Sequence, residues 1–227
     1  MAHRRVIAPA QAPSGDALTA DFVGIGLLVG GERSRDPNIE DTLLAASVEG
    51  LERDDLRVLA VLVTWFGVHS GRVNADRLTR LVTMQESKRV RAFWSALARW
   101  RAADRRFSRL VRVYRGPRLD LLSTGTDFQV ARHGEDERFA GSKLRVPAKI
   151  LRDRPADVLQ PAELARSHAA YRWRLVIGPT YRADMWAALE RQPDLSVAAL
   201  ARATYGSFAT AWQVRRDFAV WRFASGS

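Results

Sequence analysis

The sequence contains no cysteine and only four histidines, His3, His69, His133 and His168. Without cysteine the chain cannot form a disulfide framework or a thiolate metal site. The histidines are too far apart along the chain to match a common zinc-ligand spacing. We therefore expect no structural zinc and no other cofactor.

Long apolar runs are also missing. The longest, from about Val58 to Val68, is interrupted by Thr64 and Gly67 and is too short to cross a bilayer, which takes about 18 residues. The first ten residues carry two arginines without an apolar core behind them, so they make a poor signal peptide. We expect a cytoplasmic protein with no membrane partner, and a disordered tail over residues 1–20, which are rich in Ala, Pro, Gly and Ser.

Arginine is the residue in excess. The chain has 36 basic and 25 acidic residues, a net charge of +11, and 33 of the basic residues are arginine. The segment 72–118 alone holds 14 basic and three acidic residues, so its net charge equals that of the whole chain. The overall arginine content can reflect GC-rich coding or a solvated surface. Its concentration in one segment favours a nucleic-acid partner, because clustered cations release counterions from phosphates.

The length and apolar content suffice for two small cores. We expect a mainly α fold with small β wings, made of two winged-helix-like three-helix units joined by an irregular α+β segment. The expected parts after the tail are residues 21–122, a connecting segment 123–180 and a C-terminal unit 181–227.

Helical spacing and caps predict the elements of the first unit. Its expected helices start at Asp36, Asp54, Asn74 and about Glu86. Before them, the apolar, glycine-rich residues 22–31 predict a short strand or packed turn, since they lack the lysine of a phosphate-binding loop. After them, residues 110–114 and 119–122 flank Gly116-Pro117 and predict the two strands of a wing.

The connecting segment is harder to interpret. Short strands are possible at residues 128–131 and 143–146, and Pro161 opens a helix that should run to Ile177 and end at Gly178-Pro179. The C-terminal 47 residues predict helices over 181–191, over 197–203 after a Ser196 cap, and from a Ser207 cap to about Phe223.

Residues 195–218 resemble the helix-turn-helix of winged-helix transcription regulators. The features that carry the resemblance are the apolar-alanine pair Leu200-Ala201, then Gly206 five residues on, then Ser207. Ala201 allows two helices to cross closely, Gly206 tolerates a left-handed turn, and Ser207 caps the last helix. The resemblance implies double-stranded DNA as partner and regulation of transcription, with a possible homodimer because operators are commonly two-fold.

The two predicted units also resemble one another. Shifting the last helix back by 121 residues places Ala211, Val214, Phe218 and Trp221 on Val90, Phe93, Leu97 and Trp100. Two amphipathic helices can align by chance at their common period. We interpret residues 54–122 and 181–223 as two copies of one three-helix plan, in which each third helix is a candidate for DNA recognition.

The candidate DNA-binding residues are those off the apolar faces and those in the predicted wing. Arginine suits guanine edges and phosphates, and Gln213 could read adenine. In the first third helix they are Ser87, Lys88, Arg89, Arg91, Ser95 and Arg99. Along the wing they are Arg105, Arg106, Arg109, Arg112 and Arg115. In the last helix they are Thr210, Gln213 and Arg216. We interpret Trp94, which lies among them, as a packing residue and not as a base-stacking one.

We expect no enzyme. A group of acidic residues lies close to His133 in sequence, but its spacing matches no metal or acid-base motif; its members are Asp120, Asp127, Glu135, Asp136 and Glu137. The alternative to a DNA-binding regulator is an antitoxin-like or defence-system module that uses winged-helix folds to hold a protein partner. RNA binding fits the charge but lacks an aromatic RNA-binding signature.

Overall fold

The computed structural model describes residues 8, 9 and 11–225, and it is mainly helical with one two-stranded parallel sheet. The chain divides into two compact units, which we name the N-terminal unit (residues 11–160) and the C-terminal unit (residues 161 onward, to which the described residues 8 and 9 are also assigned). No described helix is long and apolar enough to span a bilayer.

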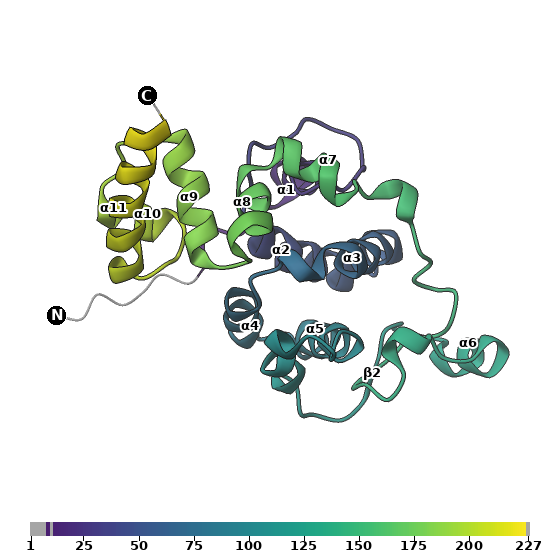
Figure 1. Cartoon of the computed structure of the whole chain (residues 1–227). Helices are drawn as coiled ribbons and strands as arrows, with labels where there is room; N and C mark the ends of the chain where they lie inside the picture. The colour runs from purple at the N-terminus through teal and green to yellow at the C-terminus, as the bar shows by residue number, and fades with distance from the viewer. Residues whose placement is uncertain (1–7, 10, 226–227) are drawn as a thin grey trace. The chain divides into compact units, whose positions relative to one another are not determined.

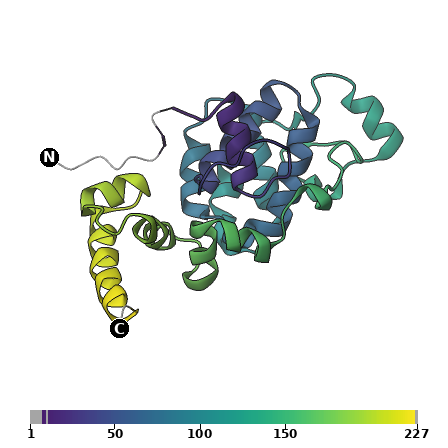
Figure 2. The same cartoon turned by 90° about the horizontal axis from the view of Figure 1, so that it is seen from above.

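The N-terminal unit is a helical bundle with short 3₁₀ turns and the small sheet (Figure 1). Helix α6 projects from the bundle in both views (Figures 1 and 2). The elements of the unit are α1 (Gly15–Gly24), α2 (Ile39–Glu52), α3 (Leu56–His69), η1 (Ser70–Arg72), α4 (Ala75–Thr83), α5 (Lys88–Trp100), η2 (Arg105–Ser108), η3 (Leu110–Arg112), β1 (Leu119–Asp120), α6 (Thr126–His133), η4 (Glu137–Phe139), β2 (Leu144–Arg145) and η5 (Pro155–Asp157).

Helix α5 lies at the centre of this unit. Trp94 is fully buried between Phe66 and Phe93, with ring centroids 5.7 Å from each, and its indole Nε1 donates to Ser47 Oγ at 2.8 Å. Phe107 of η2 packs on Phe66 at 5.4 Å. The prediction that Trp94 is a packing residue is therefore confirmed.

Two predicted caps are displaced by one or two residues. Helix α2 is capped by Asn38 and α3 by Asp55, whose side chains accept backbone N–H groups of the first turn. Asp36 and Asp54 both have φ of 50°, a left-handed conformation that precedes the cap and does not make it. The Asn74 cap of α4 is confirmed, and α5 is capped by Ser87.

Residues 15–20 belong to α1 and bury Leu18, so the prediction of a disordered tail is wrong for them; residues 1–7 and 10 lie outside the described part. The glycine-rich residues 22–31 continue from α1 into a turn, and Leu27 forms an isolated antiparallel bridge with Val158. The predicted strand at 128–131 is wrong, because these residues lie in α6, whereas residues 143–146 do contain β2.

The predicted wing is also wrong. Residues 110–112 form the 3₁₀ turn η3, and β1 pairs in parallel with β2, with Leu119 opposite Leu144. The physical reason is the spacing of buried side chains: Phe107, Leu110 and Tyr114 all point into the core, a three- to four-residue period that suits helical turns. The described residues contain no antiparallel hairpin at this position.

The C-terminal unit consists of α7 (Pro161–Ser167), α8 (Ala169–Ile177), α9 (Tyr181–Arg191), α10 (Val197–Ala203) and α11 (Phe208–Ser225). The predicted last three helices are confirmed, with caps from Ser196 and Ser207. The predicted helix 161–177 is broken at His168, whose Nδ1 accepts the Tyr171 N–H and starts α8. The structure therefore groups α7 and α8, expected in a connecting segment, with the helix-turn-helix residues.

The core of α9, α10 and α11 contains Met185, Ala188, Leu189, Leu200, Ala211, Val214 and Phe218. The expected inner face of α11 is confirmed for Ala211, Val214 and Phe218 and wrong for Trp221, which is 43% exposed. The turn between α10 and α11 differs from the expectation. Tyr205, with φ of 57°, takes the left-handed position, and Gly206 serves another purpose. A Cβ at Gly206 would lie 2.1 Å from Met185 Cε, so glycine allows the close approach of the turn to α9.

Candidate functional site

The predicted recognition helix α5 is enclosed by the N-terminal unit. Its residues 90 and 92–98 are all buried, with α2, α4, η3 and η4 packed around it. A helix can enter a DNA major groove only if one side of it is free. The middle of α5 is therefore closed to DNA, and base contacts by Lys88 and Arg99 at its exposed ends stay a prediction.

Two of the predicted contact residues on α5 make structural hydrogen bonds. Ser95 is only 5% exposed, and its Oγ donates to the Val111 carbonyl of η3 at 2.6 Å. Arg89 donates to the Leu51 and Leu121 carbonyls and to Asp54 Oδ1, at 2.7–2.8 Å. Both side chains hold neighbouring segments against the helix, so they are unavailable for a ligand.

The remaining candidates on α5 differ in exposure. Ser87 is the N-cap and accepts the Val90 N–H. Arg91 is half-buried, with a buried Nε that has no hydrogen-bond partner in the described part of the chain. Lys88 and Arg99, at opposite ends of the helix, are exposed.

The predicted wing arginines form a row despite the absence of a wing. Arg109 has right-handed helical backbone angles and connects η2 to η3. Residues three apart eclipse one another in a 3₁₀ helix and rise by about 6 Å. Arg106, Arg109 and Arg112 therefore follow one line; Arg105 precedes it, and Arg115 follows after the 3₁₀ turns have ended. We name residues 105–115 the arginine ridge.

Buried contacts hold the ridge in place from below. Phe107 and Leu110 are fully buried, and the Tyr114 hydroxyl donates to the Pro117 carbonyl at 2.9 Å. Arg106 turns inward and donates to the Val73, Ser70 and Gly71 carbonyls and to Asp104. The side-chain hydrogen bond from Arg106 lowers the pKa of Asp104, so this pair stays ionised. Arg106 thus anchors the ridge.

Ion pairs reduce the positive charge of the segment 72–118. Arg77, Arg80, Arg89, Arg106, Arg109 and Arg118 each lie within 4.0 Å of a carboxylate, and three of those carboxylates, Asp41, Asp54 and Glu135, come from outside the segment. Among the described residues of the segment, the exposed cations without an ion pair or hydrogen bond are Lys88, Arg99, Arg105, Arg112 and Arg115. The ridge holds three of them, and Arg109 is 73% exposed with only a 3.5 Å contact to Asp76.

The C-terminal unit presents the other predicted residues on α11. Thr210 is half-buried and its hydroxyl lies 2.7 Å from Ser207 Oγ, whereas Gln213 and Arg216 are exposed. The Arg216 guanidinium lies over the Trp212 ring, 5.3 Å from its centroid. Sequence reasoning missed Phe208 and Trp212, which are 62% and 51% exposed on the same helix. The sequence did indicate them, because they are large aromatic residues that lie outside the apolar face of α11 that packs in the core.

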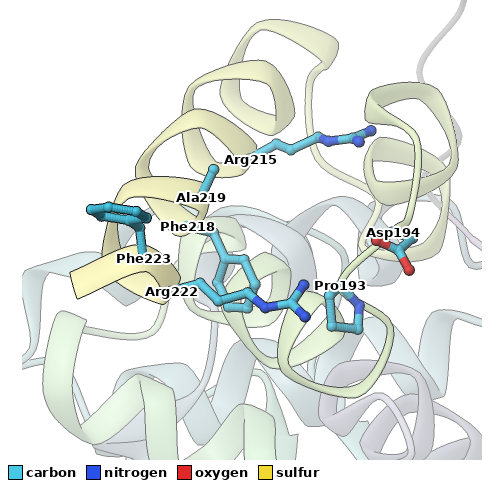
Figure 3. Close-up of a pocket in the computed structure, with 7 residues that line it drawn as sticks. All are labelled: Pro193, Asp194, Arg215, Phe218, Ala219, Arg222 and Phe223. Atoms are coloured by element: carbon cyan, nitrogen blue, oxygen red, sulfur yellow. The ribbon is translucent and has the colours of Figure 1, made fainter. Parts of the chain in front are cut away.

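A groove runs along α11. One hollow of about 550 Å³ is lined by α11 and by Pro193 and Asp194 of the loop between α9 and α10 (Figure 3). A second, of about 320 Å³, is lined by Val197 and by Trp212, Arg215, Arg216 and Ala219. Arg215 and Ala219 line both hollows, so the two are neighbours along α11, and we name them together the groove.

The acidic residues of the segment 120–136 are engaged by arginines. Asp120 and Asp127 both pair with Arg145, Glu135 pairs with Arg118, and Asp136 with Arg138. The hydrogen bond from Arg145 lowers the pKa of Asp120. No group of three or more potential metal ligands occurs among the residues that the structure describes.

Comparison with known proteins returned no match: no family model, curated protein or solved structure is similar to the chain. The evidence for function is therefore the geometry of the two exposed surfaces, the arginine ridge and the groove along α11.

Proposed function

We propose that the protein binds double-stranded DNA through its phosphate backbone, using the arginine ridge. The observation that carries the proposal is the concentration of four exposed arginines, Arg105, Arg109, Arg112 and Arg115, in one short segment whose apolar residues are buried. Guanidinium groups donate paired hydrogen bonds to phosphate oxygens and stay charged at all physiological pH values.

The aromatic residues of the ridge support a duplex over a single strand. Proteins that bind single-stranded nucleic acid stack bases on exposed aromatic rings. Phe107 is fully buried and Tyr114 is 6% exposed, so neither ring is available to a base. The ridge offers cations without a stacking surface, which suits the regular backbone of a duplex. Binding through phosphates alone carries little sequence preference.

The experiment is fluorescence anisotropy with a labelled 20-base-pair duplex over a range of salt concentrations. A variant with Arg105, Arg109, Arg112 and Arg115 replaced by glutamine should bind at least tenfold more weakly. The slope of log K against log salt should fall by about 3 to 4, since each phosphate contact contributes about 0.9.

A matched variant controls for net charge. Arg57, Arg132, Arg166 and Arg202 are exposed and lie outside the ridge, so their replacement by glutamine removes the same charge elsewhere. This control should bind nearly as tightly as the wild type. An equal loss of duplex affinity in the two variants would contradict the proposal. Tighter binding of single-stranded RNA than of the duplex would contradict it too. Replacing Arg89 is a poor test, because it removes three structural hydrogen bonds.

Regulation of transcription and homodimer formation are predictions from the sequence that this proposal does not require. A regulator would need selective contacts to bases in addition to the ridge.

A further inference from the structure

Helix α11 carries a second apolar stripe that does not belong to the core of its unit. Its core stripe is Ala211, Val214 and Phe218, all buried. The other stripe contains Phe208, Trp212, Ala219 and Phe223, all exposed. A helix that serves only to close a small unit needs one apolar face. The second stripe therefore indicates a surface that is covered by something else.

The spacing of this stripe is that of a helix-packing seam. With Arg215 included, successive members lie four, three, four and four residues apart, so they share one face of the α-helix, as the anchors of a helix-packing surface do. The groove runs along the same side, since Trp212, Arg215 and Ala219 line it. Phe223 lines the other hollow, on the side opposite Pro193 and Asp194 (Figure 3). An elongated groove with this periodicity fits a helical segment.

The charges around the groove are mainly positive. Arg215, Arg216 and Arg222 line it, against a single lining carboxylate, Asp194. Arg215 Nη1 also donates to the Leu195 carbonyl at 2.7 Å, which fixes its side chain across the groove. Tryptophan and arginine are the residue types most enriched at the energetic centres of protein interfaces. The chemistry of the groove thus combines apolar anchors with a basic rim.

We propose that the groove along α11 binds an acidic amphipathic helix of a partner protein, with its apolar side chains on Trp212 and Phe223 and its carboxylates on Arg216 and Arg222. A second copy of the same surface would place these arginines opposite one another, and like charges across an interface are unfavourable. The proposal does not depend on DNA binding by the ridge, which lies in the N-terminal unit.

The test uses the full chain and two synthetic 21-residue helical peptides labelled with fluorescein. Both carry leucine at 3.5-residue spacing; one has glutamate at the flanking positions and the other lysine. We expect the glutamate peptide to bind at least tenfold more tightly than the lysine peptide in anisotropy titrations. Trp212→Ala should weaken its binding by at least tenfold, whereas the four-arginine ridge variant should bind it as the wild type does.

A charge-reversal variant makes the test specific. Arg216→Glu combined with Arg222→Glu should invert the preference, so that the lysine peptide binds more tightly. Both side chains are exposed and Arg222 has no ion pair in the described part of the chain, so the unit should remain folded, which circular dichroism checks. Absence of a preference in the wild type, or no inversion in a folded variant, would overturn the proposal.

Two further outcomes would assign the groove to another occupant. If sedimentation shows a dimer that Trp212→Ala dissociates, the groove holds a second copy. If Trp212→Ala abolishes duplex binding while the ridge variant retains it, the groove binds nucleic acid. Either result contradicts the proposed acidic partner, and the second also contradicts the proposed role of the ridge.

Discussion

Helices α5 and α11 have the same inner pattern and opposite surroundings. Val90, Phe93 and Leu97 of α5 are buried, as are the aligned Ala211, Val214 and Phe218 of α11. The outer side of α5 is also buried, beneath η3 and η4, whereas the outer side of α11 exposes Phe208, Trp212 and Gln213. A repeated apolar face therefore identifies how a helix joins its own unit, and it does not identify which helix meets a partner.

The largest expected effect comes from truncating one tryptophan in each helix. Trp94→Ala should destabilise the N-terminal unit by about 3–5 kcal/mol, because a buried ring and its hydrogen bond to Ser47 are lost. Trp212→Ala should change the stability of the C-terminal unit by about 0.5 kcal/mol or less, since half of its surface is exposed.

Hydrogen exchange of peptides from α5 and from α11 would measure the two effects separately. A similar loss of protection from exchange in both units would contradict the contrast between a buried α5 and an exposed α11. A stable Trp212→Ala variant is also the condition for using it in the peptide-binding experiment.

Acid sensitivity tests how completely the N-terminal unit excludes water. His69 is fully buried, and this desolvation lowers its pKa from 6.5 to about 4, although the Leu159 carbonyl accepts a hydrogen bond from its ring. The unfolded chain therefore binds the proton first as pH falls. Stability should be complete above about pH 6.5 and should decrease by up to about 3 kcal/mol as pH falls to about 4.

The measurement is the free energy of unfolding of the N-terminal unit in urea between pH 7.5 and 4.5, for the wild type and for His69→Gln. The variant lacks the titrating group, so its stability should depend less on pH over this range. Identical pH slopes for the two proteins would show that His69 does not titrate as a buried neutral residue.

The smallest expected changes in stability come from substitutions in the turns that precede α5 and α11. Gly206→Ala should destabilise the C-terminal unit by about 1–3 kcal/mol, because the new methyl group would overlap Met185 in a filled core. Met84, in the turn before α5, is 58% exposed, and Met84→Ala should change stability by about 0.5 kcal/mol or less.

A double variant isolates the cause in the first case. Gly206→Ala combined with Met185→Ala should lower the free energy of unfolding by less than the sum of the two single changes. The reason is that the shortened side chain at residue 185 leaves room for the new methyl group. Strictly additive losses in urea unfolding would show that Met185 is not the limiting contact.

Local patterns predicted most helices but few of the functional surfaces. The α9–α11 helices and their Ser196 and Ser207 caps follow directly from apolar spacing and capping residues. The prediction of a wing failed because Val111, Val113 and Tyr114 are residue types that favour strands, whereas the arginines recur every third residue, which suits 3₁₀ turns. The contact of η3 with Ser95 decides in favour of a helical turn, and that contact is sixteen residues distant in sequence.

A signal for the enclosure of α5 was present and was misinterpreted. Its outer side carries the small residues Ala92, Ser95 and Ala96, which allow other segments to pack closely. The outer side of α11 carries Phe208, Trp212 and Phe223 instead, whose size suits contact with a partner. The size of the outward residues therefore distinguishes the enclosed helix α5 from the exposed helix α11, whereas the number of arginines does not.

The sequence by itself determined the helical character of the chain, the inner faces of its helices and the position of its arginines, because these depend on spacing and charge along a short segment. Only the tertiary structure decided which faces stay exposed. Burial of an outer face depends on segments far away in the chain, as when η3 and η4 cover α5, and ion pairs with Asp41, Asp54 and Glu135 remove charge from a segment that looks basic alone.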